Sequence, residues 1–360
     1  MLLESGGFEP DERDPGIERG AGGRRAAGVA LRRGRAGRTP RLRDTSAGTT
    51  NHSRTRECRP AEPVDFAPRP WLDTPGWPFP RSELEPWWDR ATEVLRLVST
   101  SFDWAQWDAR DGLGPPLVET DRVTSVLFQV KFPFSFGATY REERRGFLAE
   151  RPRHDARQRH RAGRVAARRR DVRATRVDTL AGNELEVAAR VFVVATGGIE
   201  TPRLLLASDG IVPGGIGNDH DLVGRYFAEH LQVPVGFAVL HRRVEDLGPY
   251  VGMDVVHDTD PDRTAGLRAA LGRTSSAVLD AEQLGLELQF APATRHPGEP
   301  TSRTGVSSDD VDTLVTTERD APAPTGAYLQ ALGEQAPNHD SRVVLTDQRD
   351  TLGMRRVALD

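Results

Sequence analysis

"VFVVATGGIETPRLLLAS", residues 191–208, is the stretch of sequence that decides the fold. Its first five residues are apolar and mostly β-branched, which is typical of a parallel strand buried on both faces of its sheet. Thr196-Gly197-Gly198 then interrupts the apolar run, and a Leu-rich segment with Pro202 follows. We therefore predict a buried strand over 191–195, a glycine turn and a helix.

The glycine turn has two interpretations. Small residues at the carboxyl end of a parallel strand lie where α/β sheets bind ligands. Glycine lets a ligand approach the backbone closely, and the N-terminus of the following helix favours a phosphate. A tight turn that serves only as scaffold would have the same residues, so this pattern alone leaves both interpretations open.

Length and composition exclude several classes of protein. The 360 residues suffice for one large or two ordinary domains, and the net charge of −4 argues against a dedicated nucleic-acid binder. The single cysteine, Cys58, excludes an internal disulfide and a Cys-based zinc cluster, and we expect no metal site. No apolar run approaches the ~20 residues that span a bilayer. The N-terminus lacks the basic region of a signal peptide, so we expect a cytoplasmic location.

Two stretches are dominated by arginine. Residues 17–43 hold nine Arg against one Glu, and residues 141–176 hold fourteen Arg against five acidic residues. We expect disorder over 17–43 and irregular structure over 141–176. A basic helix face and a nucleic-acid arm are alternatives, although no aromatic residues are interleaved for base stacking.

Three further elements follow from periodicity. Residues 177–180 and 185–187 alternate around a turn at 181–183 and predict a hairpin. A second hairpin is predicted from 342–346 and 355–359. "SELE" at 82–85 is typical of a capping box, so we predict a helix that starts at or near Ser82, with Pro86 able to shift the start by a few residues. Its core face would be formed by Trp87, Ala91, Val94, Leu95 and Val98.

The first residues add a second indication of a dinucleotide. "LLESGG" reads as a short apolar strand that ends on Glu4. In dinucleotide-binding folds, an acidic residue at the end of the second strand accepts hydrogen bonds from the ribose hydroxyls. The Gly-rich loop expected ~20 residues earlier would lie before Met1.

Taken together, these residues resemble the glucose-methanol-choline (GMC) family of FAD-dependent oxidoreductases. The resemblance covers roughly half of the chain, in the order of the family's motifs. It rests on "LLESGGFEPD" (2–11), "AGTTNH…CRP" (47–60) with the segment 63–88, "ATGGIETPRLLLAS" (195–208), "GNDHDLVGRYFAEH" (217–230) and "NHDSRVVLTDQRDTLGMRRVALD" (338–360).

The resemblance implies a cofactor and a set of binding residues. In the family, a bound flavin takes a hydride from an alcohol carbon while a histidine acts as base on the hydroxyl group. Glu4 corresponds to the ribose ligand, and Thr196 and Gly197 to the turn that lies against the dinucleotide. Asn51 and His52 correspond to a loop that runs over the flavin ring. The expected substrate is a small alcohol or sugar, and the electron acceptor is left open.

We therefore predict an α/β fold in which an incomplete Rossmann-like FAD-binding domain is interleaved with an α+β substrate domain on an antiparallel sheet. Residues 1–60 and 136–225 would form the FAD-binding domain. Residues 61–135 and 226–360 would form the substrate or cap domain.

The function predicted is oxidation of CH–OH groups by an incomplete GMC-type chain. No catalytic residue is assigned, because the family's catalytic histidine would follow Asp360. His339 lies in a turn that the family does not use for catalysis. The alternatives are an inactive fragment of such an enzyme and a Rossmann-like module with basic arms for nucleic acid.

The coding DNA provides a test of one hypothesis about the arginine-rich stretches, namely that they are GC-rich DNA read out of frame. A +1 or −1 frame over 141–176 should then restore an alternating apolar strand. The absence of such a frame would contradict the hypothesis.

Overall fold

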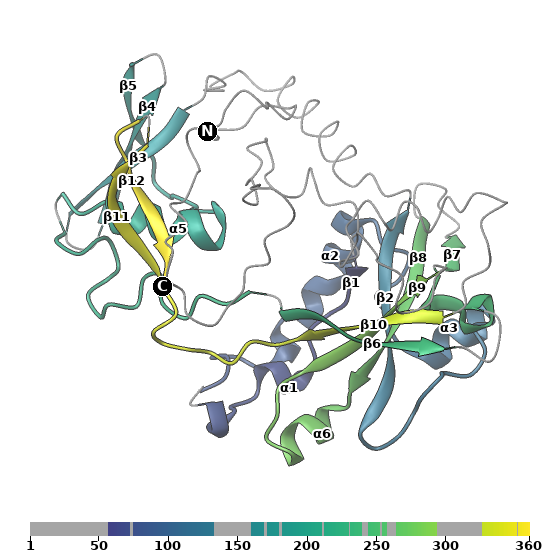
Figure 1. Ribbon diagram of the computed structural model, residues 1–360. Coiled ribbons are helices and arrows are strands. Elements are labelled where there is room, and N and C mark those ends of the chain that lie inside the picture. The colour runs from purple at the N-terminus through teal and green to yellow at the C-terminus, as the bar shows by residue number, and fades with distance from the viewer. Residues whose placement is uncertain are drawn as a thin grey trace. The chain divides into compact units, whose positions relative to one another are not determined.

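The computed structural model describes residues 57–72, 75–132, 160–168, 171–179, 182–210, 212–229, 231–239, 244–252, 254–257, 264–293, 326–350 and 352–360. These residues divide into two compact units (Figure 1). The described residues of unit 1 come from 138–228 and 337–360, and those of unit 2 come from 53–137 and 229–336. The predicted domain boundaries stay a prediction.

Unit 2 is built on one antiparallel sheet. Its strand order is β1-β2-β8-β9-β10-β6, and β7 pairs with β8 beside this path. The strands are β1 (Glu57–Cys58), β2 (Val123–Phe132), β6 (Leu231–Val239), β7 (Asp254–His257), β8 (Thr264–Arg273), β9 (Leu286–Ala293) and β10 (Gly326–Gly333). In the described parts of the chain, every paired strand is antiparallel to its neighbour, and the architecture is α/β with antiparallel sheets.

Short helices surround this sheet. They are α1 (Pro63–Phe66), α2 (Trp88–Leu95), α3 (Trp104–Asp111), α6 (Ser275–Asp280) and the 3₁₀ segments η2 (Pro70–Leu72), η3 (Arg81–Glu83), η4 (Glu85–Trp87) and η5 (Val244–Tyr250). Asp103 caps α3 by accepting a 2.9 Å hydrogen bond from the backbone N–H of Gln106. Gly112 ends the same helix in the left-handed conformation, with φ of +70°.

The predicted helix is confirmed with its start shifted past Pro86, but most of its predicted core face is not buried. Two 3₁₀ turns cover this region, and the α-helix begins only at Trp88. Pro86 has no N–H to donate, and a 3₁₀ turn holds three residues, so the α-helical spacing does not apply there. Of the predicted core face, Trp87 and Val94 are 58% and 54% exposed, whereas Val98 is buried in the core of unit 2.

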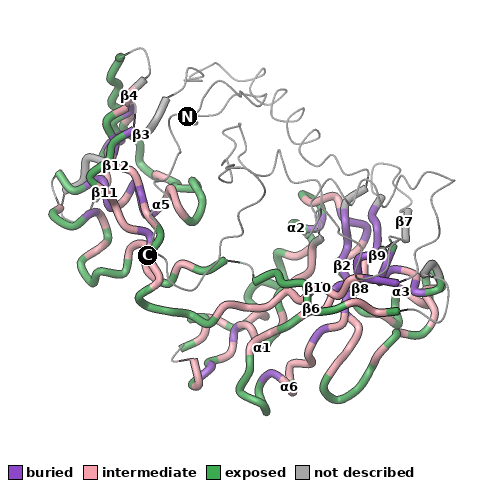
Figure 2. The backbone as a smooth tube through the Cα atoms, viewed as in Figure 1, coloured by how far each residue is buried: buried purple, intermediate pink, exposed green. Residues whose placement is uncertain are grey.

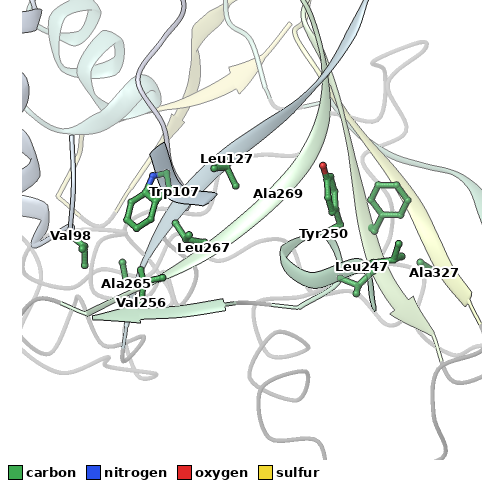
Figure 3. Packing of buried hydrophobic residues seen from close by; sticks show 12 residues of the cluster. Val98, Trp107, Leu127, Leu247, Tyr250, Val256, Ala265, Leu267, Ala269 and Ala327 are labelled. Atoms are coloured by element: carbon green, nitrogen blue, oxygen red, sulfur yellow. The ribbon is translucent and has the colours of Figure 1, made fainter. Parts of the chain in front are cut away.

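The core of unit 2 gathers where α3 and η5 meet the sheet (Figure 3). Trp107 is 2% exposed and packs in one cluster with Leu127, Leu267 and Tyr250. Strand β2 is buried on both faces, because Val126 and Phe128 pack with Ala270 in a second cluster. Figure 2 shows the contrast between buried β2 and the mostly exposed edge strand β6. Pro234 in β6 lacks an N–H, as is typical of edge strands.

One buried amide ties α3 to this sheet. The Gln129 side chain on β2 is fully buried, and its Oε1 accepts a 3.1 Å hydrogen bond from the Ser99 N–H. Its Nε2 donates to the carbonyl oxygens of Ser99 and Ser101 at 2.7 and 3.2 Å. The indole N–H of Trp107 donates to the same Ser101 carbonyl at 2.9 Å. Gln129 thus fixes the loop from which α3 begins.

A network of charged side chains joins residues 62–72 to the segments that adjoin β9 and β10. Arg69, 7% exposed, donates to Glu334 at 2.7 Å and to Asp65 at 3.0 Å. Glu334 also accepts a 2.7 Å hydrogen bond from the Gly285 N–H, just before β9. Burial raises the pKa of Asp65, and the hydrogen bond from the Glu62 N–H and then the charge of Arg69 oppose this rise.

Unit 1 contains a three-stranded sheet, a helix and a hairpin. The sheet has the order β3 (His160–Arg168), β4 (Asp171–Thr179), β5 (Glu184–Ala188). Helix α5 (Gly197–Ala207) lies against β3 and against the hairpin of β11 (Val343–Arg349) and β12 (Arg355–Leu359). Both predicted hairpins and the predicted helix after the glycine turn are confirmed.

The predicted buried strand over 191–195 is wrong for the part of the chain that the structure describes. These residues pair with no described strand, and Val191 and Val193 are 76% and 84% exposed. A strand forms only where a neighbouring backbone pairs with it, and apolar composition does not supply that neighbour. The stretch 17–43 and the apolar run that ends on Glu4 lie outside the described residues.

The structure also differs from the irregular conformation expected over 141–176, because β3 and the first residues of β4 lie there. In β4, Arg173 and Arg176 are exposed, whereas Ala174 and Val177 are 4% and 0% exposed. Thr175 and Val177 share one face of β4 and are 5% and 0% exposed, whereas exposed Arg176 lies on the opposite face beside Ala174. The high arginine content led us to expect irregular structure here, although the buried residues are typical of a strand.

Replacing Gln129 tests the tie between β2 and α3. Gln129→Met keeps the volume of the side chain but leaves the buried N–H and C=O of Ser99 without their partner. We expect the variant to lose about 2–3 kcal/mol of unfolding free energy. All six Trp residues lie between 71 and 107, so Trp fluorescence in urea follows unit 2 alone. Gln106→Met on the exposed side of α3 is the control, with a change within about 0.5 kcal/mol. Equal losses in the two variants would contradict the assignment.

Candidate functional site

The site predicted from the sequence is only partly within the described residues. Glu4, Asn51 and His52 lie outside them. Thr196 and Gly197 lie at the start of helix α5, where Thr196 is the residue before the first turn and Gly197 is its first residue. The structure therefore brings two of the five predicted cofactor-binding residues to one helix N-terminus.

This helix N-terminus is open. Gly197 has a φ of +87°, and a Cβ atom at Gly197 or Gly198 would meet no atom within 4 Å. Thr196 does not cap the helix, because its hydroxyl pairs with the hydroxyl of Thr201 at 2.9 Å. The first N–H groups of a helix have no intrahelical acceptor, and the helix dipole makes that end positive. The arrangement fits a phosphate-bearing group in close contact with the backbone.

The first turn of α5 is weak by its own composition. Gly197 and Gly198 each disfavour a helix by about 1 kcal/mol relative to alanine. Pro202 removes the N–H that would bond to the Gly198 carbonyl, and proline inside a helix costs about 3 kcal/mol. The turn therefore depends on contacts from outside the helix.

Arg203 provides these contacts. Its side chain is 2% exposed, and each of its three nitrogens donates to at least one acceptor. Nε donates to the Arg355 carbonyl at 2.7 Å, and Nη2 donates to Asp350 at 2.7 Å and to the Met354 carbonyl at 3.4 Å. Nη1 reaches back to both carboxylate oxygens of Glu200 at 3.2 Å. Arg203 thus joins the first turn of α5 to the C-terminal hairpin.

Asp350 organises the hairpin end of this contact. Its fully buried side chain accepts hydrogen bonds from the backbone N–H groups of Leu352 and Met354 at 2.9 and 3.0 Å. The same carboxylate therefore closes the turn between β11 and β12 and pairs with Arg203. Removing one partner of such a buried pair leaves an uncompensated charge, which costs about 3–5 kcal/mol.

The loop over 217–228 contacts the start of β11 through backbone hydrogen bonds. Gly224 accepts a 2.8 Å hydrogen bond from the Val343 N–H, and Phe227 donates to the Ser341 carbonyl at 3.0 Å. Gly224 has a φ of +87°, and a Cβ atom there would lie 2.5 Å from the Val343 carbonyl oxygen. Glycine is required at this position for both reasons.

An ion-pair cluster accompanies this loop. Asp221 pairs with Arg225 and, at 3.1 Å, with Arg342. The hydrogen bonds from Arg225 and then Arg342 lower the pKa of Asp221. A lowered pKa means that the pair supports the fold above the ordinary Asp pKa, and that this support is lost as pH falls through the lowered value.

His339 belongs to the same cluster. Its Nδ1 and its carbonyl oxygen face Nη1 of Arg225 at 3.2 and 3.1 Å. Its ring lies edge-on to Tyr226, with 5.6 Å between ring centroids. These contacts give His339 a structural role in the turn before β11.

Sequence reasoning missed the residues that hold this site together, namely Glu200, Arg203 and Asp350. One signal for Arg203 was present, since it is a lone basic residue in the apolar segment "PRLLLA" on a helix. A charged residue within an apolar helix face indicates a buried partner. Nothing local to the sequence indicated that this partner lies 147 residues later.

Among the described residues, no group of three or more His, Cys, Asp or Glu side chains could hold a metal ion. Nor does any described helix have the length and apolar character to cross a membrane.

Comparison with known proteins gives partial matches. No family model matches the chain. Over 73 residues, or 20% of the chain, it is 40% identical to a 2-methyl-1,2-propanediol dehydrogenase from Mycolicibacterium austroafricanum. Over 52 residues, or 14% of the chain, it is 48% identical to the fructose dehydrogenase large subunit of Gluconobacter japonicus. The chain resembles the GMC oxidoreductases.

The GMC resemblance is confirmed over part of the chain, and both curated relatives are named as dehydrogenases. The matched segments span only 13% and 10% of the lengths of the two curated relatives. A pyridoxine 4-oxidase from Mesorbium loti is a solved structure with 20% identity and a TM-score of 0.29. That match covers 56% of this chain and 34% of the oxidase.

Substitution of Gly224 tests how the hairpin is held. Gly224→Ala should cost about 3 kcal/mol, from the positive φ together with the clash against Val343. Gly217→Ala is the control, because Gly217 has a φ of +73° in the same loop and open space at its Cβ. It should cost about 1 kcal/mol. Hydrogen exchange of the Val343 amide measures both losses, and equal exchange in the two variants would contradict the clash.

Proposed function

We propose that this chain is an incomplete FAD-dependent oxidoreductase of the GMC type that acts on CH–OH groups of a small alcohol or sugar. The observation that carries the proposal is the open glycine turn at the start of α5, in a chain that resembles alcohol and sugar dehydrogenases. FAD is the expected cofactor, and a Rossmann-like domain interleaved with the antiparallel substrate domain is the expected setting.

Two described residues would hold the cofactor. Gly197 has no Cβ to keep a phosphate away from the helix N-terminus, and Thr196 leaves this end without a side-chain cap. The N–H groups of the first turn would orient the phosphates, and the helix dipole would stabilise their charge. FAD, when bound, supplies the hydride-accepting chemistry.

The other proposed cofactor contacts rest only on the resemblance to the GMC family. Glu4 would accept hydrogen bonds from the ribose hydroxyls, and Asn51 and His52 would line the flavin ring. We assign no catalytic residue and no electron acceptor. The cytoplasmic location and the incompleteness of the chain are parts of the proposal that rest on the sequence.

The names of the relatives support the substrate class. One relative is a diol dehydrogenase and another is a fructose dehydrogenase. Both are named for substrates that carry hydroxyl groups, so we infer a small polyhydroxylated or alcohol substrate. The alternative is an inactive fragment of such an enzyme that neither holds FAD nor turns over.

Titration of the purified full chain with FAD separates the two. We expect the visible flavin absorption to shift on addition of FAD, and the flavin to remain with the protein on gel filtration. Gly197→Ala should weaken binding about tenfold or more, because its new methyl group would occupy the space left for the phosphate.

Gly182→Ala is the matched control for this titration. Gly182 has a φ of +81° and open space at its Cβ, but it lies in the turn before β5. It should bind FAD as the unchanged chain does. If the unchanged chain shifts no flavin absorption, the FAD proposal fails and the inactive fragment is supported.

A further inference from the structure

The turn that would bind the cofactor is held by residues that do not line it. Glu200 lies in the first turn of α5, Arg203 lies one turn later, and Asp350 lies on the hairpin. The three side chains form one continuous chain of ion pairs from the open helix end to the β11–β12 turn.

We propose that Arg203 is a positioning residue: through Glu200 and Asp350 it fixes the open first turn of α5 against the C-terminal hairpin. The effect on FAD rests on the proposed function, whereas the effect on the helix turn does not. The guanidinium is suited to this task because its planar fork serves a carboxylate on each side and a backbone carbonyl at once.

The first turn needs this external contact. Two glycines and a proline weaken the helix between positions 197 and 202, and no side chain caps it. Arg203 is the residue that links this turn to a buried anchor, since Asp350 is fully buried and bound by two backbone N–H groups. Without the link from Glu200, the helix would stay docked by its later turns while its first turn opened.

Two ion pairs at opposite ends of the same helix allow a matched comparison. Glu200 pairs with Arg203 in the first turn. Asp209, two residues beyond the end of α5, pairs with Arg355 of β12. Asp209 pairs directly with the hairpin, whereas Glu200 reaches the hairpin only through Arg203 and lies in the first turn.

Hydrogen exchange without any ligand is the first measurement. Glu200→Ala should increase exchange of the Thr201 and Arg203 amides, which bond to carbonyls of the first turn in an α-helix. We expect about a tenfold increase, with the later amides of α5 unchanged. Asp209→Ala should leave the Thr201 and Arg203 amides unchanged. Glu200→Gln, which keeps one acceptor oxygen, should restore part of the protection.

Affinity for FAD, measured by titration of the same full-length variants, is the second measurement. Glu200→Ala should raise the dissociation constant about tenfold, Glu200→Gln by less, and Asp209→Ala by no more than about twofold. Tighter binding of FAD by Glu200→Ala would mean that the carboxylate acts by its charge alone, and would overturn the positioning role.

The two measurements test the positioning role and the proposed cofactor independently. Equal exchange in Glu200→Ala and Asp209→Ala would overturn the positioning of the helix turn, whatever the affinity for FAD. Increased exchange in Glu200→Ala alone, in a chain that binds no FAD, would support the positioning role and remove the proposed cofactor.

Discussion

The buried ion pair between Arg203 and Asp350 is the interaction on which unit 1 depends. It joins a helix to a hairpin that lies about 150 residues later in the chain, and both side chains are almost completely removed from water. Buried charges are tolerated only when their hydrogen bonds are all made. Here all three guanidinium nitrogens donate hydrogen bonds, and the carboxylate also closes the hairpin turn. Leu204 on the helix and Val343 and Val357 on the hairpin are buried, so this polar contact accompanies apolar burial in the same elements.

In unit 2, buried polar side chains likewise fix the arrangement of segments around an apolar sheet. Its apolar sheet supplies the buried area, while Gln129 and Arg69 fix the segments that cover it. Each polar side chain contacts backbone or carboxylate groups far away in sequence. Apolar burial is non-directional, whereas a buried hydrogen bond is lost if a segment shifts by one residue. The polar contacts thus specify the arrangement that the apolar contacts stabilise.

Local patterns in the sequence were sufficient for the hairpins and for helix α5, because alternation and a glycine turn are properties of neighbouring residues. The strand expected over 191–195 was wrong, since a strand needs a partner strand. The helix expected near Ser82 begins only at Trp88, beyond Pro86. Thr196 and Gly197 lie at the start of a helix, and their role in binding a cofactor stays a prediction. Arg203 and Asp350 were missed because no local pattern connects them. The roles of Glu4, Asn51 and His52 stay predictions.

Residue-level hydrogen exchange of the full chain, followed across increasing denaturant, tests the central claim most directly. If the Arg203–Asp350 pair unites helix and hairpin, the slow amides of Arg203–Ala207 in α5 and those of β11 and β12 must open together. They should share one opening free energy and one dependence on denaturant. A hairpin that opens at lower denaturant than α5, while α5 keeps its protection, would contradict the account.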